Sequence, residues 1–333
     1  VAPPLAGFGL AGRAEARRVI TAARAALASR CREVFATTNA NPREVWLAPL
    51  GEGAELALFG LPHELRVSIE ANYGYVLFVN GVPTAYGGVT PLFRQANTGV
   101  NVFPAFRGSE AAFLWTQMLR AFHTLFGVTR FVVNAVQFGE DNDEALASGA
   151  YWFYWRLGFR PASRRLAALA AREARRLAAH RSARTSPALL RKLATGDLHF
   201  TLPGAGDDDF FDELLLARCA RLATRALART GASHRGEAER ILATRVAASL
   251  GVRFERWPRA ERRAFTRMAP VVSVIPRLAR WPAADRRAVA TAMRAKGAAT
   301  ERDFALAAAR AGRLFRTLRR AATALPDTKS GKP

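Results

Sequence analysis

The chain has few cysteines and no zinc-type motif, and both shortages exclude a class of protein. Its 333 residues include only two cysteines, Cys31 and Cys219, which lie far apart in the sequence. Two distant thiols do not form the disulfide framework of a small secreted domain, so the sequence favours a reducing, cytoplasmic location. No cluster of cysteine and histidine has the spacing of a zinc site, and we expect no metal.

Long apolar runs are also missing. The longest uncharged apolar stretches, such as residues 268–276, are far shorter than the ~20 residues that a helix needs to cross a membrane. We therefore expect no transmembrane segment. Half of the residues are nonetheless apolar, which is enough to bury a sizeable core.

Lysine is scarce, whereas arginine is abundant and unevenly placed. The formal net charge is +23, of which residues 1–159 contribute +1 and residues 160–333 contribute +22. A strongly basic region can bind an anionic partner, which could be nucleic acid, an acidic protein or a lipid surface. The alternative is that these arginines cover solvated helix faces and bind nothing. The sequence leaves both interpretations open.

The order of predicted elements indicates an α/β fold with a mixed central sheet flanked by helices, followed by a mostly α-helical basic domain. The clearest single element is a β-hairpin over residues 74–89, turning at Asn80-Gly81, a pair suited to a type I′ turn. Gly87-Gly88 in its second strand predicts a bulge or the close approach of another backbone. The other expected elements are helices at residues 11–36, 109–126, 144–157 and 164–180, and strands at 55–59, 98–103, 131–137 and 198–202.

Changes in composition suggest four segments. We expect an N-terminal helical segment (1–49), a sheet domain (50–203), a basic helical domain (204–325) and a disordered tail (326–333).

The most informative motif is VFPAFRGSEAAFLW, residues 102–115, in which a strand passes through Arg107-Gly108-Ser109 into a helix. We expect Ser109 to be the N-cap of this helix. Free N–H groups and the positive end of the helix dipole make such a helix start suitable for a phosphate. Arg107 and Ala112 match the first and last positions of the pattern Arg/Gln-x-x-Gly-x-Gly/Ala.

Over about residues 50–161 the chain resembles the GNAT superfamily of N-acyltransferases. In that family a bulged central strand pairs with the pantetheine arm of acyl-CoA, and the loop after it wraps the pyrophosphate. The resemblance implies that the donor is an acyl-CoA or an acyl carrier thioester. It assigns the donor site to Val102, Phe103, Arg107, Gly108, Ser109 and Ala112.

One position departs from the family pattern. Glu110 stands where the family has glycine. A carboxylate there would repel a pyrophosphate, and its bulk would hinder the close approach of the backbone. This departure keeps open a second interpretation, in which the fold is retained and the donor site is lost.

A second motif is SGAYWFYWRLGFRP, residues 148–161. Tyr154, four residues before Gly158, matches the tyrosine of the family's Tyr-x-x-x-Gly-Phe ending. The resemblance implies that Tyr154 protonates the leaving thiolate as a general acid. The alternative is that its ring only packs the helix against the sheet.

An acidic cluster at residues 140–144 follows the predicted strand at 131–137. Clefts in open α/β sheets lie beyond the carboxyl ends of strands, so the four carboxylates of this cluster could attract a cationic amine or deprotonate it, with Glu140 or Asp141 as the candidate base. The alternative is a helix start, with Asn142 or Asp143 as the cap.

The sequence thus predicts an enzyme-like protein that transfers an acyl group from a CoA-type or carrier thioester to an amine. The alternative is a non-catalytic protein of the same fold whose basic helical domain binds nucleic acid or an acidic partner. A third hypothesis combines both, with the basic domain bringing the acyltransferase to an acyl carrier protein or aminoacyl-tRNA. Any nucleic-acid binding would depend mainly on phosphates and therefore on salt.

Overall fold

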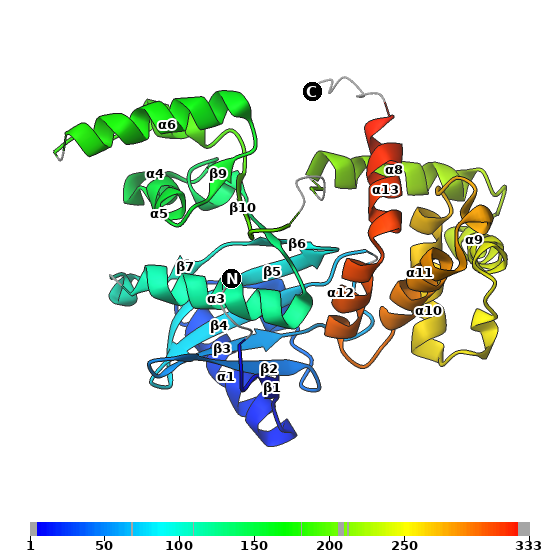
Figure 1. Cartoon of the computed structure of the whole chain (residues 1–333). Coiled ribbons are helices and arrows are strands. Elements are labelled where there is room, and N and C mark those ends of the chain that lie inside the picture. The colour runs from blue at the N-terminus through cyan, green and yellow to red at the C-terminus, as the bar shows by residue number, and fades with distance from the viewer. Residues whose placement is uncertain are drawn as a thin grey trace. The chain divides into compact units, whose positions relative to one another are not determined.

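A mixed β-sheet with helices on both faces dominates the first part of the chain, and helices form most of the rest (Figure 1). The computed structural model describes residues 5–67, 69–108, 110–180, 182–205, 210–211 and 213–325. The chain divides into two units. The sheet unit comprises Val1–Gly60, Tyr73–Thr90 and Gln95–Ala205, and the helical unit comprises Leu61–Asn72, Pro91–Arg94 and Gly206–Pro333.

Ten strands of the described residues form the sheet in the order β1-β2-β3-β4-β5-β6-β8-β10-β9, with β7 paired to β5. Strands β6 and β8 are parallel, while the hairpins are antiparallel, so the mixed α/β class predicted from the sequence is confirmed. The strands are β1 (Gly9–Leu10), β2 (Val45–Gly51), β3 (Ala54–Phe59), β4 (Tyr73–Val79), β5 (Val82–Leu92), β6 (Gln95–Thr98), β7 (Asn101–Val102), β8 (Arg130–Val133), β9 (Arg160–Pro161) and β10 (Leu198–Thr201).

The predicted hairpin is confirmed as β4 and β5. Its two turn residues, Asn80 (φ 49°) and Gly81 (φ 78°), both have the positive φ that a type I′ turn requires. Strand β4 is buried on both faces because a helix covers each one. Tyr73 and Tyr75 contact rings of α3 (Ala111–Phe126), whereas Val76 joins the apolar cluster formed with α1 (Arg13–Ala28) on the other face.

Several predicted elements were too long. The helix expected over residues 11–36 ends at Ala28, and the short helix α2 (Phe35–Thr38) follows after Cys31 adopts a positive φ. The helix expected over 144–157 is two helices, α4 (Asp143–Ser148) and α5 (Ala150–Arg156), which are separated by Gly149 in the left-handed conformation. The strand expected over 131–137 ends at Val133, because the chain turns into a 3₁₀ helix at Ala135–Gln137.

Two short strands complete the far edge of the sheet. The apolar LHFTL segment forms β10 as predicted, and β10 pairs antiparallel with both β8 and β9. Two helices lie between β9 and β10 in the sequence, α6 (Arg164–Ala179) and α7 (Pro187–Leu193), and Ser163 and Ser186 cap their starts. A helical insertion therefore separates two strands that pair with each other.

The helical unit contains α8 to α13 and also takes up two segments from within the sheet region, Leu61–Asn72 and Pro91–Arg94. The predicted domain boundary between residues 203 and 204 leaves these two segments in the sheet domain, whereas the structure groups them with the helical unit. Its helices are α8 (Glu213–Ala228), α9 (Arg235–Leu250), α10 (Arg259–Val272), α11 (Ala283–Ala295), α12 (Glu301–Arg310) and α13 (Gly312–Thr323). The tail predicted to be disordered, residues 326–333, lies outside the described residues.

The positive charge is shared between the two units. Residues 160–205 carry ten basic and two acidic side chains, a net of +8, and they belong to the sheet unit. Residues 206–333 carry 27 basic and 13 acidic side chains, a net of +14. The basic region of the sequence therefore does not coincide with one structural unit.

Candidate functional site

The strand predicted over residues 98–103 is interrupted at Gly99, and this interruption creates the candidate site. Before it, β6 pairs in parallel with β8, as Asn97 does with Val132. After it, β7 pairs with β5, as Val102 does with Ala85. The chain therefore leaves β8 at Gly99, and a gap opens between β7 and the end of β8.

Glycine at residue 87 allows this change of partner. A Cβ atom at Gly87 would lie 2.5 Å from the carbonyl oxygen of Gly99 and 2.5 Å from the hydroxyl of Tyr75. The Tyr75 hydroxyl also donates a hydrogen bond to the Gly99 carbonyl, which holds the interruption in place. The prediction that Gly87-Gly88 marks the close approach of another backbone is confirmed at Gly87.

A cavity of about 520 Å³ lies beside the interruption, entirely within the sheet unit. Its size is typical of a small-molecule site. The residues that line it come from β7, from the loop before α3, and from α4 and α5. They include Val100, Val102, Phe103, Arg107, Gly108 and Tyr154.

The backbone of Val102 presents its polar groups to this cavity. The Phe103 N–H donates to the Thr84 carbonyl over 3.0 Å, which fixes the register between β7 and β5. Successive residues of a strand direct their N–H and C=O groups to opposite edges, so those of Val102 point away from β5. The N–H of Phe103 does not face the cavity, because it forms the hydrogen bond to β5. Its buried ring stacks on Tyr86 with the centroids 5.0 Å apart.

Tyr154 has a buried ring, and it also lines the cavity. Aromatic contacts with Trp115, Phe138 and Phe159 hold the ring. Its hydroxyl oxygen accepts a hydrogen bond from the Val100 N–H over 3.4 Å. Burial raises the pKa of Tyr154 to about 12, and the hydrogen bond from Val100 opposes the shift. The hydroxyl therefore keeps its proton at neutral pH.

Arg107 forms an exposed ion pair at the mouth of the cavity. Its guanidinium donates to Glu144 Oε1 over 2.6 Å, and Arg32 lies 3.8 Å from Glu144 Oε2. The hydrogen bond from Arg107 lowers the pKa of Glu144, so this carboxylate stays ionised. Arg32 was not predicted as a site residue, and Glu144 was considered only as part of the acidic cluster at residues 140–144. Its pairing with Arg107 and Arg32 was not predicted, because the three residues come from segments far apart in the sequence.

The start of α3 differs from the prediction. The helix begins at Ala111, and Glu110 is at the N-cap position that we assigned to Ser109. Ser109 itself lies outside the described residues. Gly108 and Ala111 line the cavity, whereas Ala112 does not.

The acidic cluster is mainly a helix start, as the alternative interpretation held. The Asn142 side chain accepts from the Ala145 N–H over 3.0 Å and caps α4. Glu140 and Asp141 lie in the preceding turn, and neither lines the cavity. The structure therefore does not bring these two candidate bases to Tyr154. The carboxylate that it does bring there is Glu144.

A second cavity of about 470 Å³ adjoins the first and shares Val100, Val102, Arg107 and Ala111 with it. Most of its other walls are apolar side chains of β4, β5 and α3, including Leu77, Val82, Leu114, Trp115 and Met118. Its lining is therefore suited to an apolar group.

None of the protein-family models, curated proteins or solved structures compared with this chain matches it. In the part of the chain that the structure describes, no helix combines the length and the apolar character needed to cross a membrane.

Proposed function

We propose that the sheet unit is a GNAT-like acyltransferase that passes an acyl group from a CoA-type or carrier thioester to an amine. The observation that carries the proposal is the interrupted strand at Gly99. It leaves the polar edge of Val102 facing a cavity in which the hydroxyl of Tyr154 is held by the Val100 N–H. The sequence resemblance places a pantetheine arm at such a strand.

The backbone of Val102 is suited to a thioester donor. Its carbonyl can accept from an amide N–H of the donor arm. Its N–H can donate to the thioester oxygen, where negative charge develops when the amine attacks. The N–H of Phe103 is not available to that oxygen, since it already donates to the Thr84 carbonyl.

Tyr154 supplies the proton in the proposed reaction. The neutral amine nitrogen forms a bond to the carbonyl carbon and loses a proton to solvent, and the carbon–sulfur bond then breaks as the tetrahedral intermediate collapses to the amide. The sulfur leaves as a thiolate and takes the proton of the Tyr154 hydroxyl, which solvent later restores. Burial raises the pKa of Tyr154 to about 12, so the hydroxyl is protonated throughout the neutral range, and the same shift makes it a weaker acid than an exposed tyrosine.

Glu144, rather than Glu140 or Asp141, is the carboxylate that we propose interacts with the amine substrate. Because Arg107 lowers the pKa of Glu144, this side chain is a weak base but a persistent negative charge. Its role in the proposal is to attract a cationic amine, which then loses its proton to water before the attack.

Arg107 and the start of α3 are proposed to hold the phosphates of the donor. The ion pair of Arg107 with Glu144 does not prevent this, because both side chains are more than half exposed, at 51% and 60%. Solvent screens an exposed pair, so a phosphate can displace the carboxylate at little cost. The family closes its sheet with a β-hairpin, and this chain departs from that pattern, because two helices separate β9 from β10 in the sequence.

Calorimetric titration with acetyl-CoA and with decanoyl-CoA tests the proposal. We expect micromolar binding to the parent protein, weaker binding to Arg107→Ala and unchanged binding to Arg165→Ala, an exposed arginine of α6 outside the cavity. Tighter binding of decanoyl-CoA would place the acyl chain in the apolar second cavity. No binding of either donor to the parent protein would contradict the proposed function.

The second candidate function is the non-catalytic one, and Glu110 is the observation that favours it. This residue is at the N-cap of α3, where the family pattern has glycine and a carboxylate opposes a phosphate. Donor binding to Glu110→Gly but not to the parent would favour this candidate, because it would mean that the fold persists while the donor site has been lost.

A further inference from the structure

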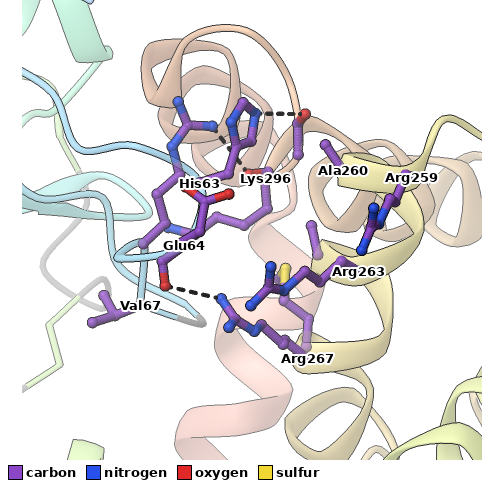
Figure 2. Close-up of a pocket in the computed structure, with 12 residues that line it drawn as sticks. His63, Glu64, Val67, Arg259, Ala260, Arg263, Arg267 and Lys296 are labelled. Carbon is purple, nitrogen blue, oxygen red and sulfur yellow. Dashed lines mark hydrogen bonds between the residues drawn. The ribbon is translucent and has the colours of Figure 1, made fainter. Parts of the chain in front are cut away.

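A cavity of about 380 Å³ lies within the helical unit and is not part of the proposed acyl-transfer site. One wall is helix α10, and the opposite wall is the segment that carries His63, Glu64 and Val67. Figure 2 shows Arg259, Arg263 and Arg267 on the α10 side and His63 and Glu64 on the other side.

The three arginines form one row along α10. They are four residues apart, so they share a helix face and follow one another at intervals of roughly 6 Å along the axis. Ala260, Ala264 and Met268 line the cavity beside them. The cavity therefore has a polar strip of cationic groups and an apolar strip next to it.

This row opposes the stability of its own helix. Like charges at intervals of four residues repel each other, and Arg259 is the first residue of α10, where the helix dipole disfavours a cation. Among the described residues, no carboxylate lies within ion-pair distance of Arg259 or Arg263. Among the described residues that line the cavity, Glu64 alone has a carboxylate side chain, and it contacts the row through its backbone oxygen, 3.4 Å from Arg267.

The other cationic groups in the wall have structural roles. Arg66 is buried and donates to the carbonyl oxygens of Leu61, Ala298 and Ala299. Lys296 is buried and pairs with Glu301. His63 Nε2 lies 2.9 Å from the Ala298 carbonyl, which anchors its side of the cavity. These bonds hold the wall in position, and they leave the arginine row as the part able to bind a ligand.

We propose that this cavity binds a ligand that carries two or more phosphate groups, held by Arg259, Arg263 and Arg267. Guanidinium groups bind phosphate oxygens through charge-assisted hydrogen bonds, and an anion would relieve the repulsion along the row. The volume is within the range of small-molecule sites, and the strip formed by Ala260, Ala264 and Met268 can contact an apolar part of the ligand. The proposal does not depend on the acyl-transfer function.

Fluorescence or calorimetric titration of the full chain with tripolyphosphate, ATP and a single-stranded oligonucleotide tests it, with citrate as a polycarboxylate control. We expect saturable binding of tripolyphosphate, weakened about tenfold in Arg263→Gln, as expected for the loss of a charged hydrogen bond. The matched control is Arg262→Gln, which removes the same charge from the neighbouring position of α10, outside the cavity. Its affinity should stay within about twofold of the parent protein, because Arg262 is expected to make no contact with the ligand.

A second readout separates a binding role from a structural one. Without ligand, Arg263→Gln should be at least as thermally stable as the parent, because a repulsive neighbour is gone. With tripolyphosphate, the parent should gain more thermal stability than this variant. Binding that also requires a nucleoside or a polynucleotide would identify the source of the phosphates. No saturable binding of any phosphate probe, equal loss in Arg262→Gln, or equally tight binding of citrate would overturn the proposal.

Discussion

The buried ion pair of the helical unit gives the sharpest test of its stability. The side chains of Lys296 and Glu301 are 3% and 0% exposed, and they join the end of α11 to the start of α12. Lys296 also donates to the Glu70 carbonyl, and its ammonium lies 4.2 Å from the centroid of the Phe304 ring. Glu301 Oε2 accepts from the Asn72 N–H over 3.2 Å. We predict that Glu301→Gln strongly destabilises the unit.

The magnitude follows from the charge left behind. Removing one partner of a buried pair typically costs about 3–5 kcal/mol, because the remaining ion is desolvated without compensation. Here the cost has a ceiling, since Lys296 can instead lose its proton. Losing the proton at pH 7 from an ordinary pKa of about 10.4 costs roughly 4.6 kcal/mol. Glutamine can still accept from the Asn72 N–H, so that hydrogen bond is not part of the loss.

Urea denaturation followed by far-UV circular dichroism measures this loss. The double variant Lys296→Met/Glu301→Gln removes both charges and should recover about 2 kcal/mol of the loss. Burial lowers the pKa of Lys296. Without Glu301 it should fall further, so the unfolded chain would bind more protons between that value and about pH 10. The difference in the free energy of unfolding between the parent and Glu301→Gln should therefore become smaller as the pH rises. A loss below about 1 kcal/mol, or a double variant no more stable than Glu301→Gln, would refute this reasoning.

Three further predictions concern the sheet unit. Burial lowers the pKa of His199 from 6.5 to about 4, so its contribution to stability is complete above pH 6.5 and is lost as the pH falls towards 4. Between pH 7 and pH 4, the free energy of unfolding of His199→Gln should therefore fall by about 3 kcal/mol less than that of the parent in urea titrations. Equal decreases would contradict this. Gly87→Ala should destabilise the protein by about 1–3 kcal/mol in thermal unfolding, because its Cβ would meet the Gly99 carbonyl. Gly88→Ala is the control, since its Cβ would meet no atom closer than 3.5 Å, and equal effects would contradict the close approach. Tyr154→Phe should lower kcat by about 100-fold with little change in donor binding, measured by thiol release, and unchanged turnover would exclude the acid role.

Local sequence chemistry was sufficient to predict much of the sheet unit. Asn80-Gly81 predicted the hairpin, because few other pairs adopt two successive positive φ values easily. The helix predicted over residues 109–126 corresponds to α3, and LHFTL predicted β10. These elements depend on side chains that are neighbours in sequence, so their pattern can be interpreted without knowing the partners.

Element ends and backbone breaks were harder to predict. Gly149 interrupts a run of helix-compatible residues, and Cys31 turns the chain with a positive φ that cysteine rarely adopts. The carboxylate that lines the cavity was also hard to predict. Glu140, Asp141 and Glu144 are equivalent in the sequence, and only their positions around the cap residue Asn142 separate them.

The sequence by itself determined the α/β class, the hairpin and the helix that follows Arg107, because these depend on local conformational preference. Tertiary structure alone decided that the strand changes partners at Gly99, since that requires Gly87 and Gly99 to meet across two strands. It also decided that Arg107 meets Glu144, and that the row on α10 faces residues 63–67. Contacts between distant segments depend on packing and charge in three dimensions. The Gly87-Gly88 pair predicted that another backbone comes close, but it did not indicate which one.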